Sequence, residues 1–146
     1  MGWPRISSAL FYQDAAKAID WVCKAFGFEV QLKVEGEGGT IEHSELRLGE
    51  GLIMIGSVRK RPDRAWCASP RSLDGLNTQS LLVLVDDVDA HCARARAAGA
   101  KIATEPATQD YGSDYDTHRT YEAIDPEGHH WWFMKVLREG AKQGGK

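Results

Sequence analysis

The stretch "DPEGHHWWFMK", residues 125–135, sets two histidines and two tryptophans side by side directly after a tight turn. An imidazole can ligate a divalent metal ion or transfer a proton, and an indole offers a flat apolar face on which a planar ring can stack. Because neighbouring residues of a strand point to opposite faces, His129 and His130 cannot chelate one ion together. The pattern predicts a strand that presents one histidine and one tryptophan to a binding site.

The other histidines are separated along the chain. His43 lies near Glu45 on a predicted strand, where it could line the edge of a cavity or make a structural hydrogen bond. His91 projects from a predicted helix, where a solvated or flanking position is expected. His118 precedes a strand in a polar stretch that suits a surface role. We therefore predict no metal site among these histidines.

Length and charge narrow the class of protein. The 146 residues suit one compact domain, or two small halves that share a core. A net charge of −3 argues against sequence-independent binding of nucleic acid, which needs many phosphate contacts. No apolar run approaches the roughly 20 residues of a membrane span, and "MGWPRISS" lacks the apolar core of a signal peptide. We predict a cytoplasmic protein with neither nucleic-acid nor membrane partners.

The three cysteines are odd in number and show no close spacing, which is typical of reduced thiols. Cys23 and Cys92 fall on the apolar stripes of predicted helices. Both are expected to be buried, free and without a catalytic role.

An internal repeat organises the chain. Residues 12–30 resemble residues 84–102 at an offset of 72 positions, each with an acidic helix start, about three turns of helix and a glycine stop. Asp14, and Asp86 or Asp87, can accept hydrogen bonds from the free amides of a helix start. Gly27 and Gly99 can adopt the left-handed conformation that ends a helix.

Strands are predicted on both sides of each helix. They span 6–12, 28–35, 41–48 and 52–57 in the first copy, and 79–85, 101–106, 119–124 and 129–136 in the second.

The predicted fold class is therefore α+β, with βαβββ modules at 1–57 and 79–137 in one compact domain. A linker loop at 58–78 joins the modules, and a flexible tail follows at 138–146. One module leaves the sheet face opposite its helix uncovered, so two modules side by side can curl into a half-barrel around a cavity. Ligand sites favour such concave places. A ferredoxin-like pair of halves with no site is the alternative.

Four segments in this order resemble the vicinal oxygen chelate superfamily, which contains glyoxalase I, extradiol dioxygenases and bleomycin resistance proteins. They are "ALFYQDAAKAIDWVCKAFGFEV", "HSELRLGEGLIMIGS", "SLLVLVDDVDAHCARARAAGAKI" and "YGSDYDTHRTYEAIDPEGHHWWF". The likeness is greatest to the bacterial glyoxalase-like branch, in which, as the resemblance implies, His43 recurs. The resemblance implies the glyoxalase/bleomycin resistance fold, a curled mixed sheet around a cavity. It implies no single activity, because the superfamily includes isomerases, dioxygenases, lyases and drug-binding proteins.

Catalytic members of that superfamily hold a metal ion between the two halves on His, Glu or Gln side chains. The resemblance places those ligand positions at Ser7, Met54, Ser80 and Trp132. A neutral hydroxyl is a poor ligand, a thioether prefers soft Cu(I), and indole offers only a donor N–H. The usual metal site is therefore expected to be absent, and we predict no metal and no cofactor.

Strand alternation then assigns two faces. Residues expected to face the cavity are Ser7, Ala9, Phe11, Met54, Ser80, Leu82, Leu84, His130, Trp132 and Met134, with His43 at its edge and Tyr121 on its approach. Residues expected to face the helices are Ile6, Leu10, Leu81, Val83, Val85, Trp131 and Phe133. Trp132 is expected to contribute more to ligand binding than any other residue.

These expectations favour a metal-independent protein that binds or sequesters a small, partly aromatic compound in a pocket shared by two halves or two subunits. The alternative is a glyoxalase-like lyase or isomerase with a non-standard metal site or none. A purely structural module would fit a cavity filled by its own side chains. The resemblance and the open strand edges also predict a homodimer.

Overall fold

The computed structural model of the chain describes residues 2–58 and 62–141. The first module consists of β1 (Ser8–Tyr12), α1 (Ala15–Phe26), β2 (Glu29–Glu35), β3 (Ile41–Leu48) and β4 (Gly51–Ser57). The second consists of β5 (Leu81–Leu84), α2 (Val88–Ala97), β6 (Lys101–Asp110), β7 (Thr117–Ile124) and β8 (His130–Arg138). The described part of the linker contains two short 3₁₀ turns, Pro62–Arg64 and Pro70–Leu73.

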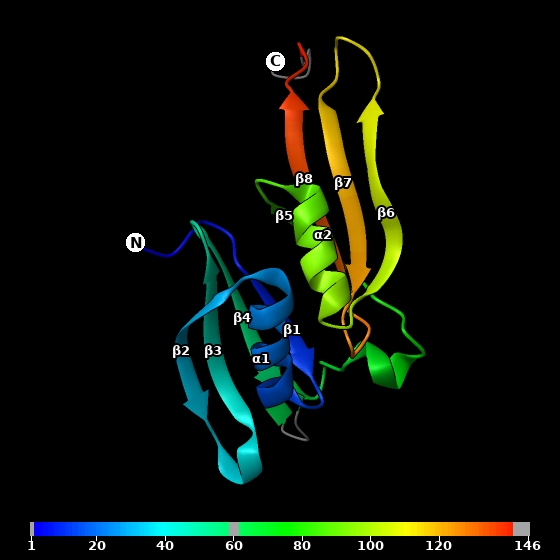
Figure 1. The fold of residues 1–146 in the computed structure, drawn as a ribbon. Helices are drawn as coiled ribbons and strands as arrows, with labels where there is room; N and C mark the ends of the chain where they lie inside the picture. Colours follow the sequence, from blue (N-terminus) through cyan, green and yellow to red (C-terminus); the bar gives the residue numbers. More distant parts are fainter. Residues whose placement is uncertain (1, 59–61, 142–146) are drawn as a thin grey trace.

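Each module forms its own four-stranded mixed sheet, in the orders β1-β4-β3-β2 and β5-β8-β7-β6. In both, the first strand lies parallel to the last, and the remaining pairs are antiparallel. The predicted α+β class and tandem βαβββ order are confirmed. The two sheets lie side by side with α1 and α2 on the near side of the view (Figure 1).

Local sequence explains where the helices begin and end. The Asp14 side chain accepts a hydrogen bond from the Lys17 amide, and Asp87 does the same for Ala90. Gly27 ends α1 with φ 87°, a left-handed conformation in which a side chain would be strained. Within the described ranges, neither helix is long and apolar enough to cross a membrane.

The expected tail at 138–146 begins at the last residue of β8, and its residues 142–146 lie outside the described part of the chain. The strand 101–106 is longer than predicted, since β6 continues to Asp110. Ile6 was expected to face the helices, but its side chain is 85% exposed because β1 begins only at Ser8. Cys92 is buried as expected, whereas Cys23 is only half-buried.

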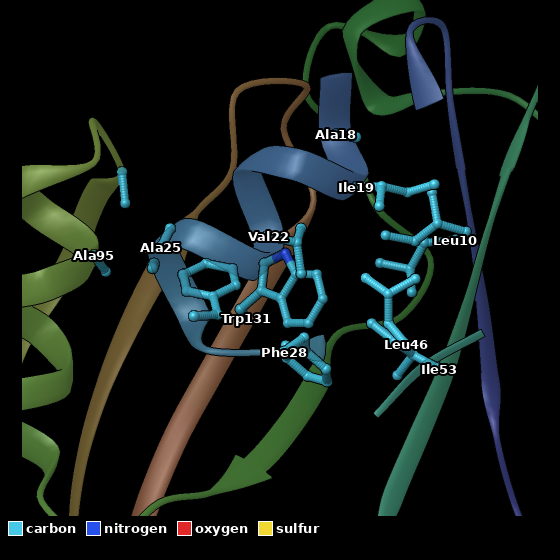
Figure 2. Close-up of a cluster of buried hydrophobic side chains, with 14 of the residues drawn as sticks. Leu10, Ala18, Ile19, Val22, Ala25, Phe28, Leu46, Ile53, Ala95 and Trp131 are labelled. Atoms are coloured by element: carbon cyan, nitrogen blue, oxygen red, sulfur yellow. The ribbon is translucent and has the colours of Figure 1, made fainter. Parts of the chain in front are cut away.

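One apolar core joins the two modules. Trp131 of β8 is fully buried, and its ring centroid lies 4.9 Å from that of Phe26 on α1. The Phe26 ring also lies 4.7 Å from Phe133. Figure 2 shows the Trp131 ring beside Val22 and Phe28 of the first module. The helix of the first module therefore packs on the sheet of the second, and the halves share a core.

Polar contacts at the β7–β8 turn form a second connection, here called the intermodule clasp (Asp125, Glu127 and His129). Asp125 accepts hydrogen bonds from Tyr12 Oη at 2.6 Å and from Trp131 Nε1 at 3.0 Å. Burial, and then the charge of Asp125, raises the pKa of Tyr12 well above its usual value. His129 Nε2 lies 2.8 Å from the Phe11 carbonyl oxygen, to which it donates.

Glu127 of the clasp is buried and reaches the start of α1. Its carboxylate accepts from the Gln13 and Asp14 amides at 2.7 and 2.9 Å. It also accepts from the Ser69 hydroxyl of the linker at 2.6 Å. A negative charge at a helix start is favourable, so Glu127 stabilises α1 from the other module.

His91 of α2 was expected to be solvated or to flank the helix, and it makes structural contacts to Phe26 and Tyr121. Its Nε2 lies 2.9 Å from the Phe26 carbonyl oxygen, and its Nδ1 lies 2.6 Å from Tyr121 Oη. A carbonyl only accepts, so Nε2 carries the proton and Nδ1 accepts from the Tyr121 hydroxyl. Burial lowers the pKa of His91 and raises that of Tyr121, because both charged forms lose solvation.

Candidate functional site

Each sheet has one face covered by helices and one open face. Along β8, Trp131 and Phe133 are fully buried, whereas Trp132 and Met134 are only half-buried on the opposite face. Leu82, which pairs with Trp132, is 58% exposed. The alternation predicted for this strand is therefore the one observed, and it places Trp132 on the open face of the second sheet.

The positions that correspond to metal ligands lie at matching places in the two modules. Met54 of β4 pairs with Ala9 of β1, as Trp132 of β8 pairs with Leu82 of β5. Ser7 directly precedes β1, and its hydroxyl oxygen is buried with no hydrogen-bond partner among the described residues. Ser80 directly precedes β5.

This donor set contains one thioether, two hydroxyls and an indole, and it does not suit a divalent cation. Within residues 2–58 and 62–141, no three His, Cys, Asp or Glu side chains lie close enough together to hold a metal ion. The residues present do not fit the metal that the superfamily resemblance implies.

Each open face instead carries a histidine–glutamate pair. His43 Nε2 lies 2.8 Å from Glu45 Oε2, and His130 Nδ1 lies 2.7 Å from Glu122 Oε2. The hydrogen bond from His43 lowers the pKa of Glu45. Both carboxylates are largely shielded, with side-chain exposures of 11% and 14%.

The two glutamates occupy equivalent positions of the repeat. Glu122 pairs with Trp132 in the register of β7 and β8. In the first module, Glu45 and Met54 each lie next to the pair Leu46–Ile53, so extending the register of β3 and β4 by one residue sets them opposite each other. The sequence pattern placed Glu45 near His43 but did not identify Glu122 as its equivalent. The signal lies in cross-strand register, which single-sequence spacing does not give.

A cavity of about 270 Å³ lies where β1, the linker and the start of β8 meet, and is called the seam cavity below. Four of the residues expected to face a cavity line it: Ala9, Phe11, Ser80 and His130. The remaining wall comes from residues of the linker and neighbouring strand ends: Ser8, Leu10, Trp66, Cys67, Ala68, Pro70, Leu73, Leu76, Asn77, Thr78, Gln79, Leu81 and His129.

The linker wall was missed because the segment was interpreted as a plain connection. Its apolar residues Trp66, Leu73 and Leu76 were the available signal, since exposed connecting loops seldom need them. Trp66 packs edge-on against Phe11 with ring centroids 5.3 Å apart. Asn77 donates to the Gly128 carbonyl at 2.9 Å, which ties the linker to the β7–β8 turn.

The other expected site residues lie outside the seam cavity. His43, Met54, Leu82 and Trp132 are on or beside the open sheet faces. The expectation that Tyr121 lies on the approach to the cavity is wrong. Tyr121 is fully buried on the helix-covered face, where its hydroxyl contacts His91. Its neighbour Glu122 takes the open face, because side chains alternate along β7.

Comparison with known proteins agrees with the tandem βαβββ fold of this chain. The model of the glyoxalase/bleomycin resistance protein/dioxygenase superfamily matches residues 5–133. The chain belongs to this superfamily. The uncharacterized protein Mb0911c of Mycobacterium bovis is 33% identical over 136 residues, covering 93% of this chain and 86% of that protein.

Two solved structures illustrate the range of the superfamily fold. TioX from Micromonospora sp. ML1 is 33% identical, covers 92% of this chain and 99% of its own, and superposes with a TM-score of 0.69. A glyoxalase I mutant from Zea mays, 15% identical with a TM-score of 0.65, covers 91% of this chain and 44% of its own. The maize likeness shows the fold alone.

Proposed function

We propose that this protein binds and sequesters a small, partly aromatic compound without using a metal ion. The observation that carries this proposal is the lining of the seam cavity, where Phe11, Trp66 and aliphatic side chains lie beside hydroxyl, amide and imidazole groups that can orient a ligand. Such a composition is typical of small-molecule sites. An engineered cavity of about 150 Å³ accepts benzene. The 270 Å³ here suits one substituted ring or a compact bicyclic compound.

Trp132 is not among the residues lining the cavity, so the proposed site is centred on Phe11 and Trp66. Trp132 extends it only if the ligand reaches the open face of the second sheet. Equilibrium dialysis of single-ring and bicyclic aromatic compounds against the purified protein tests this. Phe11→Ala should weaken binding by roughly 1–3 kcal/mol, as for a buried aromatic anchor, and Trp132→Ala should weaken it less. Equal losses of binding affinity in both variants would contradict a binding site in the seam cavity.

Metal independence is tested separately, by elemental analysis and by titration with Ni²⁺, Zn²⁺ and Mn²⁺. We expect less than stoichiometric metal and unchanged ligand affinity. Stoichiometric metal bound through open-face residues would contradict the proposal.

The alternative function is a glyoxalase-like lyase or isomerase. One observation favours it: the His130–Glu122 pair sets an imidazole beside a shielded carboxylate at the cavity, an arrangement able to move protons. Turnover that His130→Gln abolishes without loss of ligand binding would establish the enzyme instead of the binding protein.

We also propose that the protein is a cytoplasmic homodimer. The open faces expose large apolar side chains, including Leu84 at 62% and Leu32 at 42%, which a second copy would cover. Sedimentation at micromolar concentration should give about twice the 16.2 kDa chain mass. A value near one chain mass would contradict it.

A further inference from the structure

The His130–Glu122 pair fixes the tautomer of an imidazole at the seam cavity. His130 Nδ1 lies 2.7 Å from Glu122 Oε2, and a carboxylate can only accept. The proton of neutral His130 is therefore on Nδ1, and Nε2 carries a lone pair. Nε2 has no hydrogen-bond partner among the described residues, although His130 lines the cavity. Glu122 thus holds the imidazole through Nδ1 and leaves Nε2 as the acceptor that His130 can offer to a ligand.

Neighbouring contacts hold this pair in place. Thr104 Oγ1 donates to the other Glu122 oxygen at 3.3 Å, and the His130 amide lies 3.4 Å from Asn77 Oδ1. The Glu122 side chain is 14% exposed and that of His130 is 31% exposed. A shielded carboxylate keeps the imidazole oriented and stabilises any positive charge that it gains.

The rest of the described lining carries no permanently charged side chain. Among the described residues that line the cavity there is no Lys, Arg, Asp or Glu, and its other titratable groups are Cys67 and His129. His129 already donates its Nε2 proton to the Phe11 carbonyl oxygen, and Cys67 Sγ lies 3.2 Å from the Arg64 carbonyl oxygen. A carboxylate or phosphate placed there would find a cationic partner among the described lining residues only in protonated His130 or His129, and the guanidinium carbon of Arg64 lies 5.8 Å from the Phe11 ring centroid.

Resting on the proposed function, we infer that the ligand is a phenol. Its ring packs between Phe11 and the apolar linker side chains, and its O–H donates to Nε2 of His130. When the bound phenol is sufficiently acidic, its proton passes from the phenol oxygen to Nε2 of His130. This leaves a phenolate beside an imidazolium whose charge Glu122 balances.

The repeat supplies a matched control for this inference. His43 and Glu45 form the same kind of pair on the first sheet, at 2.8 Å, but His43 does not line the seam cavity. A substitution there removes a histidine–glutamate pair from an open face and leaves the proposed acceptor intact.

The experiment compares 4-nitrophenol with 4-nitroanisole, in which a methyl group replaces the hydroxyl proton. Equilibrium dialysis gives the two dissociation constants, and the visible absorbance of the phenolate reports the protonation of bound 4-nitrophenol. We expect 4-nitrophenol to bind roughly tenfold more tightly, as one hydrogen bond to a charge-supported acceptor allows. Its bound form should ionise at lower pH than the free form.

Three variants, checked for folding by circular dichroism, test the residues. His130→Gln should abolish both the preference and the ionisation shift. Glu122→Gln can still accept from Nδ1, so it should reduce the shift while keeping much of the affinity. His43→Gln should change neither.

The outcomes separate the two proposals. Equal binding of both compounds by the wild type overturns the phenol assignment and leaves the aromatic cavity standing. Binding of neither compound at millimolar concentration overturns both. A loss of preference in His43→Gln as large as in His130→Gln also overturns the assignment to His130.

Discussion

Replacing Trp131 by alanine tests the shared core most directly. The side chain is fully buried and contacts rings of both modules, and its Nε1 donates to Asp125 at 3.0 Å. Truncating a buried tryptophan costs about 3–5 kcal/mol. Asp125 keeps its hydrogen bonds from Tyr12 and from the backbone, so no large further penalty for an unpaired charge is expected. The loss is a substantial part of a typical stability of about 5–15 kcal/mol.

The assay is urea unfolding followed by far-UV circular dichroism, with Trp132→Ala as the matched control. Trp132 is half-buried on the open face, so its truncation should cost about 1 kcal/mol or less. Trp131→Phe keeps a ring but removes the donor to Asp125, and it should fall between the two alanine variants. If Trp132→Ala destabilised the protein as much as Trp131→Ala, the register of β8 would be wrong by one residue.

Three further predictions follow from the polar contacts and the thiols. Burial lowers the pKa of His91, so its contribution to stability is complete above the unfolded-state pKa of about 6.5. It declines below that pH and is lost as the pH falls through the lower pKa of the folded state. Unfolding measured down to about pH 5.5 should therefore show a steeper decline in the wild type than in His91→Gln. Glu127→Gln should reduce the free energy of unfolding by about 1.5–3 kcal/mol, because a buried carboxylate with three donors is replaced by a neutral amide. An unchanged urea midpoint would contradict a stabilising role of the intermodule clasp. Native Cys92 should react with a thiol reagent more slowly than the half-buried Cys23, and equal rates would contradict their placement.

The fold was predictable because its signals are local. The N-cap aspartates, the glycine at the end of α1 and the two-residue alternation of β8 each act over a few positions. The offset of 72 residues then revealed the second copy without any knowledge of contacts. The predicted face of Ile6 was wrong because the start of β1 depends on where its pairing with β4 begins, and alternation alone does not show this.

The candidate site was only partly predictable because its walls meet through distant contacts. Phe11 and His130 were found from strand patterns, but the linker reaches them through Ser69–Glu127 and Asn77–Gly128 hydrogen bonds. Tyr121 was misplaced for a related reason. Its face depends on the register between β7 and β8, in which it pairs with the buried Phe133.

The position of Glu127 also bears on the order in which the chain can fold during synthesis. Its carboxylate holds the Gln13 and Asp14 amides, which precede it by 114 and 113 residues. The ribosome releases the N-terminal half first, so α1 emerges without this partner and without the Trp131 ring that packs on it. The first half of the duplication therefore reaches its final stability only after nearly the whole chain has emerged. The two copies are therefore joined by one apolar core and by the contacts of Glu127.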